Sequence, residues 1–324
     1  MIKVVFFATP KIALKSLDYL IKSDKIEVLA VVTQPDKPTG RGHKLCAPPV
    51  KEYAIQHNIP VFQPDSIKKE LEIQEELKKL EPDFFVTFAF GQILSKEVLE
   101  IPKFATINLH ASLLPLYRGA NPIQRAIING DKKTGICTMI TEEGLDCGAI
   151  CLIDEIEITE NMNYEELFEH ISEKSPELIE VTLLSIKSGE LQPMEQCCDN
   201  VSYANKIKKE DAQIDWSKSA REIHNLVRGL YKSPSAHCIF REKFVKILET
   251  RVLENEHKEE FQGSTGEILK ISKEGIEVAT TKGILLVVKV KPEGKGEMFA
   301  RDWVNGLSGS IPGGAKVLIG DKFL

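Results

Sequence analysis

Two periods of hydrophobic and polar positions alternate along the first half of the chain. Short apolar runs, typical of buried strands, are separated by stretches with the three-to-four-residue spacing of amphipathic helices. The expected strands are residues 2–7, 28–33, 84–88 and 105–109, and the expected helices are residues 12–21, 50–58 and 66–80. Strands that alternate with helices predict an α/β domain with a mostly parallel, Rossmann-like sheet.

The second half has a different pattern. A helix expected at residues 164–187 closes the first domain, the polar stretch 190–209 follows as a linker, and another helix is expected at residues 220–230. Short strand-like runs come next, at residues 236–240, 245–248, 267–271, 276–280, 284–290 and 316–319. Such spacing is typical of a small β-barrel. We therefore expect two domains, residues 1–189 and 210–324.

Length and composition agree with this organisation. A chain of 324 residues exceeds the usual single core, and its 42% hydrophobic content suits a globular enzyme. Its seven cysteines lack metal-like spacing, and Cys197-Cys198 is read as incidental. With no signal peptide before the first strand, we expect reduced thiols in the cytoplasm and no metal. No apolar run approaches the ~20 residues that span a bilayer, so we expect no membrane insertion.

Three polar residues carry the strongest chemical signal. Asn108 and His110 flank Leu109 at the end of the fourth expected strand, and side chains alternate across a strand, so both project from one face. Asp146 lies in the glycine-flanked loop Gly144–Gly148, between two apolar runs. Sites in open α/β sheets collect at such loops, which predicts that the three residues share a pocket.

An amide, an imidazole and a carboxylate suit the attack of an amine on a carbonyl carbon. The amide of Asn108 would donate to the oxyanion of the tetrahedral intermediate. His110 would handle the proton that the amine loses, and Asp146 would orient the ring and favour its charged form.

Each residue also has a plainer interpretation. Asn108 could satisfy backbone groups at a strand end, His110 could be a hydrogen-bonded core histidine, and Asp146 could be a turn former. Taken singly, these interpretations are favoured. Their conjunction with the unusual run SLLPLYRG at residues 112–119 favours an active site.

Five separated blocks resemble the formyltransferases that use 10-formyltetrahydrofolate. They are residues 6–10 (FFATP), 33–42 (TQPDKPTGRG), 88–94 (FAFGQIL), the segment with Asn108 and His110, and 214–217 (IDWS). From end to end, the chain is similar to the members that formylate methionyl-initiator tRNA for translation initiation. The resemblance implies a Rossmann-like formyltransferase domain followed by a smaller OB-like barrel that binds tRNA, with Asn108, His110 and Asp146 as catalytic residues.

The resemblance also implies a folate site. Its contacts would come from the loop Ser112, Leu113, Leu114 and Pro115 and from Phe88, Phe90, Gly91 and Leu94. Apolar side chains and backbone groups suit a flat pterin ring. Core packing is the alternative for Phe88, Phe90 and Leu94. The first turn lacks the G-x-G-x-x-G pattern, which argues against a dinucleotide.

The sequence departs from the family pattern at four places. Ala8 stands where the family usually has Gly, Phe90 replaces a usual Tyr, and Cys147 replaces a usual Thr. The run around Lys232, YKSP at residues 231–234, replaces a frequent NPWP. None of these departures removes a catalytic group.

The net charge of −6 means that any tRNA contact must be local. Arg41 and Lys44 lie in a basic loop with glycines, and a guanidinium both pairs with phosphate and stacks on bases, so we expect Arg41 to meet the acceptor stem. The linker adds three expected contacts, Lys206, Lys208 and Lys209. Four further cations lie in the expected barrel: Lys289, Lys291, Lys295 and Arg301. For these, solvated surface charge explains the sequence as readily as tRNA contact does.

Two other functions stay open. The same chemistry could serve another amine, such as a nucleotide-linked amino sugar or glycinamide ribonucleotide, or the scaffold could bind folate or RNA without catalysis. The amino-acid sequences of residues 34–42, 121–125 and 144–146 resemble those of the tRNA enzymes and favour the tRNA acceptor, and the intact polar trio favours an enzyme. We expect a monomer.

Overall fold

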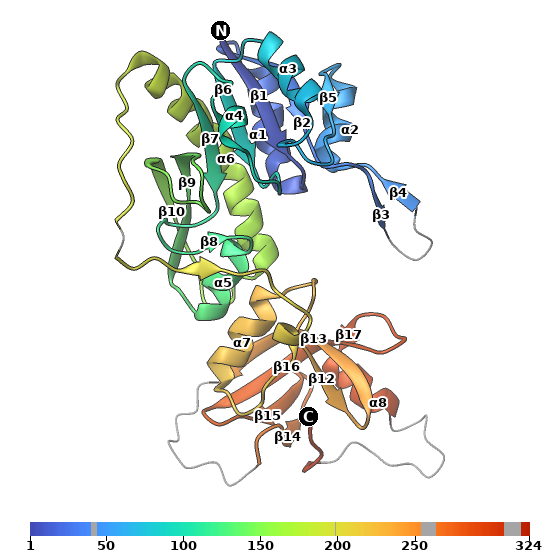
Figure 1. Ribbon diagram of the computed structural model, residues 1–324. Helices are drawn as coiled ribbons and strands as arrows, with labels where there is room; N and C mark the ends of the chain where they lie inside the picture. Colours follow the sequence, from blue (N-terminus) through green and yellow to red (C-terminus); the bar gives the residue numbers. More distant parts are fainter. Residues whose placement is uncertain (40–43, 198, 254–263, 308–318) are drawn as a thin grey trace. The chain divides into compact units, whose positions relative to one another are not determined.

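The computed structural model describes residues 1–39, 44–197, 199–253, 264–307 and 319–324 (Figure 1). The chain divides into two compact units. The first comprises residues 1–122, 133–157 and 168–204, and the second comprises residues 123–132, 158–167 and 205–324. Each unit has its own sheet and hydrophobic core. The residue boundaries expected for the two domains stay a prediction.

A seven-stranded sheet forms the first unit, in the order β10-β9-β7-β6-β1-β2-β5. Its strands are β1 (Ile2–Ala8), β2 (Ile26–Val32), β5 (Val61–Phe62), β6 (Phe84–Phe88), β7 (Ala105–His110), β9 (Lys133–Ile140) and β10 (Ile150–Glu157). The five strands from β7 to β5 are parallel, whereas β9 runs antiparallel to both of its neighbours. The expected mostly parallel α/β sheet is confirmed.

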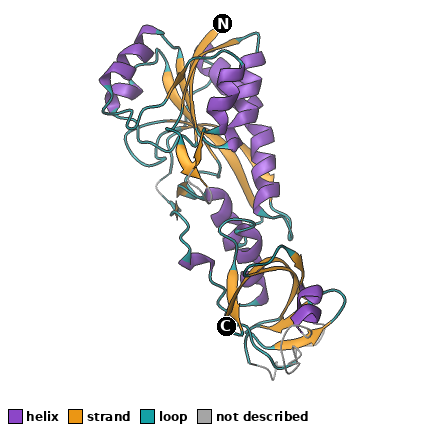
Figure 2. Cartoon of the chain, turned by 90° about the vertical axis from the view of Figure 1, so that its right-hand side faces the viewer, coloured by secondary structure: helices purple, strands orange, loops and turns teal. Residues whose placement is uncertain are grey.

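Helices lie on both faces of this sheet (Figure 2). They are α1 (Leu14–Lys22), α2 (Pro49–Gln56), α3 (Leu71–Lys79), α4 (Lys96–Leu99) and α6 (Tyr164–Ser188). The hydroxyls of Ser16 and Ser175 are 2.9 Å apart, so α1 and α6 meet through short side chains. Val5 and Phe7 of β1 pack in one core cluster with Val98 of α4. Both faces of the sheet are therefore buried, as its continuous apolar strands predicted.

The helix expected at residues 66–80 begins later than predicted, at Leu71. The backbone N–H of Ile67 donates to the Gln92 side chain at 2.8 Å, and its carbonyl accepts from the Gln74 side chain at 2.7 Å. Because the side chains of Gln92 and Gln74 occupy the N–H and the carbonyl of Ile67, residues 66–70 form a turn and not the first turn of the helix.

An antiparallel sheet forms the core of the second unit, in the order β12-β13-β16-β15-β14, with β17 also paired to β16. The strands are β12 (His237–Phe240), β13 (Lys243–Leu253), β14 (Ile268–Ile271), β15 (Ile276–Ala279), β16 (Ile284–Pro292) and β17 (Met298–Phe299). The expected helix is α7 (Ala220–Gly229), which begins with a capping box between Ser219 and Glu222. A further helix, α8 (Ala300–Leu307), was not expected. Most of the strand expected at residues 316–319 lies outside the described residues.

Residues 321–324 close this sheet. Leu324 exchanges two backbone hydrogen bonds of 2.8 Å with Ile239 of β12. On the other side, Phe323 donates to Gly266 at 2.9 Å and Asp321 accepts from Ile268 of β14 at 2.8 Å. Residues 321–324 thus bond to β12 and to β14, the two strands at the ends of the strand order. This closure confirms the OB-like barrel predicted for this half of the chain.

Candidate active site

The interior strand β7 carries Asn108 and His110. In the parallel pairing of β6 with β7, Asn108 lies opposite Thr87. The Thr87 hydroxyl donates a 2.8 Å hydrogen bond to the amide oxygen of Asn108. This bond occupies the oxygen and orients the amide, and no hydrogen-bond partner for its Nδ2 group is found within the described part of the chain. Asn108 therefore presents a fixed N–H donor.

The imidazole of His110 lies between two oxygen atoms. Its Nε2 is 2.9 Å from the carbonyl oxygen of Tyr117 and donates to it, which sets the tautomer of a neutral ring. Its Nδ1 is 3.6 Å from a carboxylate oxygen of Asp146, slightly beyond a direct hydrogen bond. A proton placed on Nδ1 would face that carboxylate. The side chain is 5% exposed.

Asp146 is held in place by its backbone as well as by its side chain. The N–H of Gly119 donates to the carboxylate at 2.8 Å, and the residue has a φ of 48°, an uncommon value for a non-glycine residue. At Gly148, a Cβ atom would lie 2.1 Å from the carbonyl oxygen of Ile140, so the loop can pass here only with glycine. The structure thus brings the carboxylate of Asp146 and the imidazole of His110 together. Asn108 lies two residues before His110 on β7.

The expected folate loop contributes side chains of two kinds. Ser112 and Leu114 are buried: the Ser112 hydroxyl donates to the Leu116 carbonyl at 2.6 Å, and Leu114 packs in a small core cluster with Cys137. Leu113 and Pro115 are half-buried. Only the latter two side chains retain substantial exposure.

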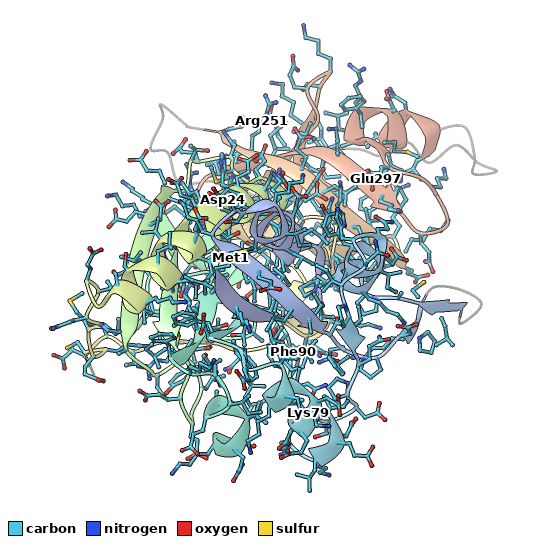
Figure 3. All side chains as sticks on the ribbon, turned by 90° about the horizontal axis from the view of Figure 1, so that it is seen from above. Met1, Asp24, Lys79, Phe90, Arg251 and Glu297 are labelled. Atoms are coloured by element: carbon cyan, nitrogen blue, oxygen red, sulfur yellow. The ribbon has the colours of Figure 1, made fainter. Side chains whose placement is uncertain are left out.

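The second expected folate segment follows β6. Phe88, Phe90 and Leu94 are buried; Phe90 is labelled in Figure 3. The ring centroids of Phe7 and Phe90 lie 5.3 Å apart. Core packing, the alternative named for these side chains, describes their environment. The backbone here is tied to neighbouring loops, because Gln34 donates to the carbonyls of Phe90 and Gly91 at 3.2 and 2.9 Å.

The departures from the family pattern are accommodated locally. Ala8 lies in β1 opposite Phe88, in regular strand pairing that needs no glycine. Cys147 is half-buried, with its sulfur 4.0 Å from the Glu143 carbonyl oxygen. Lys232, at a φ of 66°, forms an ion pair with Glu165 at 2.8 Å.

The residues expected to bind tRNA have different environments. Arg41 lies outside the described residues, as does the side chain of Lys44, whose backbone begins β4 (Lys44–Cys46). Lys206, Lys208 and Lys209 are exposed. Of the four barrel cations Lys289, Lys291, Lys295 and Arg301, two are partly neutralised. Lys289 pairs with Glu249 at 2.8 Å, and Arg301 pairs with Asp302 at 3.3 Å.

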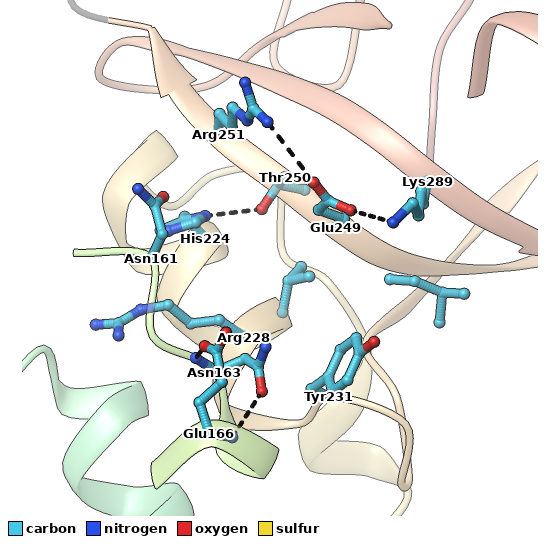
Figure 4. Close-up of a pocket in the computed structure, with 12 residues that line it drawn as sticks. Asn161, Asn163, Glu166, His224, Arg228, Tyr231, Glu249, Thr250, Arg251 and Lys289 are labelled. Atoms are coloured by element: carbon cyan, nitrogen blue, oxygen red, sulfur yellow. Dashed lines mark hydrogen bonds and ion pairs between the residues drawn. The ribbon is translucent and has the colours of Figure 1, made fainter. Parts of the chain in front are cut away.

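A cavity of about 490 Å³ lies within the second unit (Figure 4). His224, Arg228, Thr250 and Lys289 are among its lining residues, and none of the predicted catalytic residues is. Most of its polar side chains are bonded to each other or to backbone: Nδ1 of His224 lies 2.9 Å from the Thr250 hydroxyl, and Arg228 donates to the Met162 carbonyl at 2.8 Å. We assign this cavity no catalytic role.

The described residues contain neither a metal-binding cluster nor a membrane-spanning helix. No group of three or more His, Cys, Asp or Glu side chains in them could hold a metal ion. No helix among them is both long and apolar enough to cross a membrane.

Sequence reasoning missed several residues that hold the trio in place. Thr87 left a signal, since it is the one polar residue in the apolar strand FFVTF, and a buried polar group needs a partner. Gln196 left none: its side chain donates to the carbonyls of Asp146 and Gly148, 50 and 48 residues away.

The chain is similar to known proteins over most of its length. Residues 2–183 match the family model described as formyl transferase, and residues 206–308 match the one described as formyl transferase, C-terminal domain. A methionyl-tRNA formyltransferase of Clostridium perfringens (strain SM101 / Type A) is 47% identical over 94% of this chain and 96% of its own length. Its counterpart in Thermodesulfovibrio yellowstonii is 46% identical over 94% and 95%.

Solved structures share the fold at lower identity. An N-formyltransferase from Helicobacter canadensis, in complex with folinic acid and dTDP-3-aminofucose, superposes with a TM-score of 0.65 at 21% identity, covering 89% of this chain and 99% of that one. A sugar 3N-formyl transferase, WlaRD, gives the same TM-score at 19% identity, covering 91% and 99%.

Proposed function

Because this chain belongs to the methionyl-tRNA formyltransferase family, we propose that it transfers the formyl group of 10-formyltetrahydrofolate to the amino group of methionyl-initiator tRNA. The product, formylmethionyl-tRNA, starts translation, so we expect the chain to act in the cytoplasm. The observation that carries the proposal is the 3.6 Å approach of His110 to Asp146, with the oriented amide of Asn108 on the same strand as His110.

The reaction forms a bond between the amine nitrogen and the formyl carbon and breaks the bond from that carbon to N10 of the folate. In the intermediate, the former formyl oxygen carries negative charge, and the Nδ2 group of Asn108 would donate to it. Nδ1 of His110 would take the proton that the amine loses, because Nε2 is engaged by Tyr117. The Asp146 carboxylate would stabilise the positive ring until the proton passes to the departing folate nitrogen.

The folate would lie against the side chains of Leu113 and Pro115 and the backbone around Gly91. This assignment is narrower than the eight residues expected from the sequence, because the other side chains are buried. A half-exposed apolar surface with backbone hydrogen-bonding groups nearby suits a pterin ring. We expect no metal, and we keep Arg41, Lys44, Lys206, Lys208 and Lys209 as the proposed tRNA contacts.

A second candidate keeps the chemistry and changes the acceptor. The fold is shared with an enzyme solved with an amino-sugar nucleotide, so architecture alone does not select the acceptor. One assay separates the two candidates: incubate the chain with 10-formyltetrahydrofolate and, separately, methionyl-initiator tRNA, free methionine and an amino-sugar nucleotide. Formyl transfer to the charged tRNA is expected. Transfer to the sugar nucleotide, without transfer to the tRNA, would overturn the proposal.

A further inference from the structure

One segment of the first unit contacts both the loop that carries Asp146 and the segment that follows β7. We call residues 194–197 and 199–204 the strap. At its start, Met194 exchanges two backbone hydrogen bonds of 2.8 Å with Ile150 of β10. At its end, β11 (Tyr203–Ala204) pairs in parallel with β8 (Arg118–Gly119). Between these anchors, the Ser202 hydroxyl accepts the N–H of Tyr117 at 2.9 Å.

Gln196 is the strap residue whose side chain reaches the catalytic loop. Its amide nitrogen donates to the carbonyl oxygens of Asp146 and Gly148, at 2.9 and 2.8 Å. Its amide oxygen accepts two hydrogen bonds from the guanidinium of Arg118, at 3.1 and 2.7 Å. Both donors and both acceptor positions of the amide are thus used, a complete set that fixes its orientation.

Arg118 lies in the chain between Tyr117 and Gly119, the two residues that bond to His110 and Asp146. Tyr117 accepts the hydrogen bond from His110, and Gly119 donates the one to the Asp146 carboxylate. The Gln196–Arg118 pair therefore connects the loop that bears Asp146 with the segment that orients both side chains. The bond from the Gly119 N–H to the Asp146 carboxylate links the same two segments directly.

The backbone of Asp146 needs such support. A non-glycine residue at a φ of 48° is held in a sparsely populated conformation, which persists only where surrounding contacts determine it. Two hydrogen bonds from one neutral amide, to the carbonyls of Asp146 and of Gly148, supply contacts on the backbone side. The carboxylate then keeps its place 3.6 Å from the imidazole.

From these contacts we propose that Gln196 and Arg118 are positioning residues, which align Asp146 with His110 and do not touch the substrates. The inference rests on the proposed formyl transfer. An alignment error on the scale of an ångström costs up to about 100-fold in rate. Gln196→Ala should therefore lower kcat by about 10- to 100-fold, while KM for folate and for charged tRNA stays within about twofold. Glu195→Ala, an exposed neighbour, is the matched control and should keep parental kcat.

Two further variants separate alignment from general packing. Gln196→Glu keeps the shape and still accepts from Arg118, but it loses both donated bonds, so its kcat should fall as far as that of Gln196→Ala. In an Asp146→Asn background, which removes the charge being aligned, Gln196→Ala should lower kcat by less than about threefold. Full activity of Gln196→Glu, or equal losses in both backgrounds, would overturn the proposal and leave Gln196 a structural residue.

A readout without turnover keeps this test independent of the proposed function. Parent protein that formylates none of the acceptors contradicts the function, whereas the alignment is still visible in the ¹⁵N chemical shifts of the His110 ring. Gln196→Ala should move these shifts and Glu195→Ala should not. Unchanged shifts in Gln196→Ala, with the fold intact by circular dichroism, would refute the positioning role.

Discussion

At the residue scale, two of the proposed catalytic side chains have one polar atom hydrogen-bonded within the protein and another that has no hydrogen bond within the described residues. The oxygen of Asn108 is bonded by Thr87, which leaves the N–H group. Nε2 of His110 is bonded by Tyr117, which leaves Nδ1. Such fixed orientation lets a site stabilise developing charge without reorganising as the reaction proceeds.

Replacing either reactive group should slow the chemical step. Asn108→Ala removes the proposed oxyanion donor and His110→Ala the proposed proton acceptor, so each should lower kcat by ~10²-fold or more. Folate affinity should change little, because both groups act mainly in the transition state. Steady-state kinetics together with folate titration measure both quantities, and turnover equal to the parent would refute the assigned role.

Thr87 offers a milder test of the same site. Thr87→Val preserves the side-chain shape but frees the Asn108 amide to rotate, so kcat should fall by about tenfold with little change in melting temperature. Thr106→Val is the matched control, since the Thr106 hydroxyl is buried and has no hydrogen-bond partner within the described residues. Equal kcat values for the two variants would show that Thr87 does not orient the amide.

At the scale of elements, strand patterns predicted the core strands well, because burial on both faces leaves continuous apolar runs. Features fixed by long-range hydrogen bonds escaped prediction. The Gln92 side chain that takes the N–H of Ile67 leaves no periodicity, so the start of α3 was misplaced. Gln196 lies in the stretch predicted to be a linker, and its hydrogen bonds to the Asp146 loop likewise leave no pattern in the sequence. The position of His110 and Asn108 on one strand was predictable, whereas the bonds that orient them were not.

The segment that closes the barrel should contribute strongly to the stability of the second unit. Phe323 is 1% exposed and lies against Trp216, Phe240 and Trp303. Phe323→Ala leaves a large cavity and should cost about 3–5 kcal/mol in the free energy of unfolding. Leu324→Ala, at a 69% exposed neighbour, should cost less than about 0.5 kcal/mol. Urea denaturation measures both, and similar costs would mean that closure does not depend on this ring.

Helix α7 carries a pH-dependent contribution. Burial, with the positive charge of Arg228 nearby, lowers the pKa of His224 below its ordinary 6.5, although the carbonyl of Glu160 opposes the shift. The unfolded chain then binds a proton more readily, so the contribution of this residue is complete above pH 6.5 and declines as pH falls below it. Urea unfolding between pH 5 and 8 should show this decline for the parent and less of it for His224→Gln. Parallel curves would exclude the effect.

At the scale of the whole molecule, a net charge of −6 confines tRNA recognition to local basic groups. If Lys208 and Lys209 neutralise phosphates, replacing both by Ala should weaken tRNA binding and reduce the salt slope of log K by roughly one unit per contact. Lys68→Ala with Lys69→Ala is the matched control, an adjacent exposed pair in the first unit. Filter binding across salt concentrations measures the slopes, and identical slopes would remove the lysines from the interface.

The strand order has a consequence for how the trio would come apart. Strand β7, with Asn108 and His110, is the third of seven strands and is hydrogen-bonded on both edges, to β9 and β6. Exchange of its amide protons with deuterated water should require opening close to global unfolding. Asp146 instead lies on a loop between β9 and β10, the latter at the sheet margin. Gradual warming should therefore free the carboxylate while the imidazole is still held, and activity should fade before the fold does.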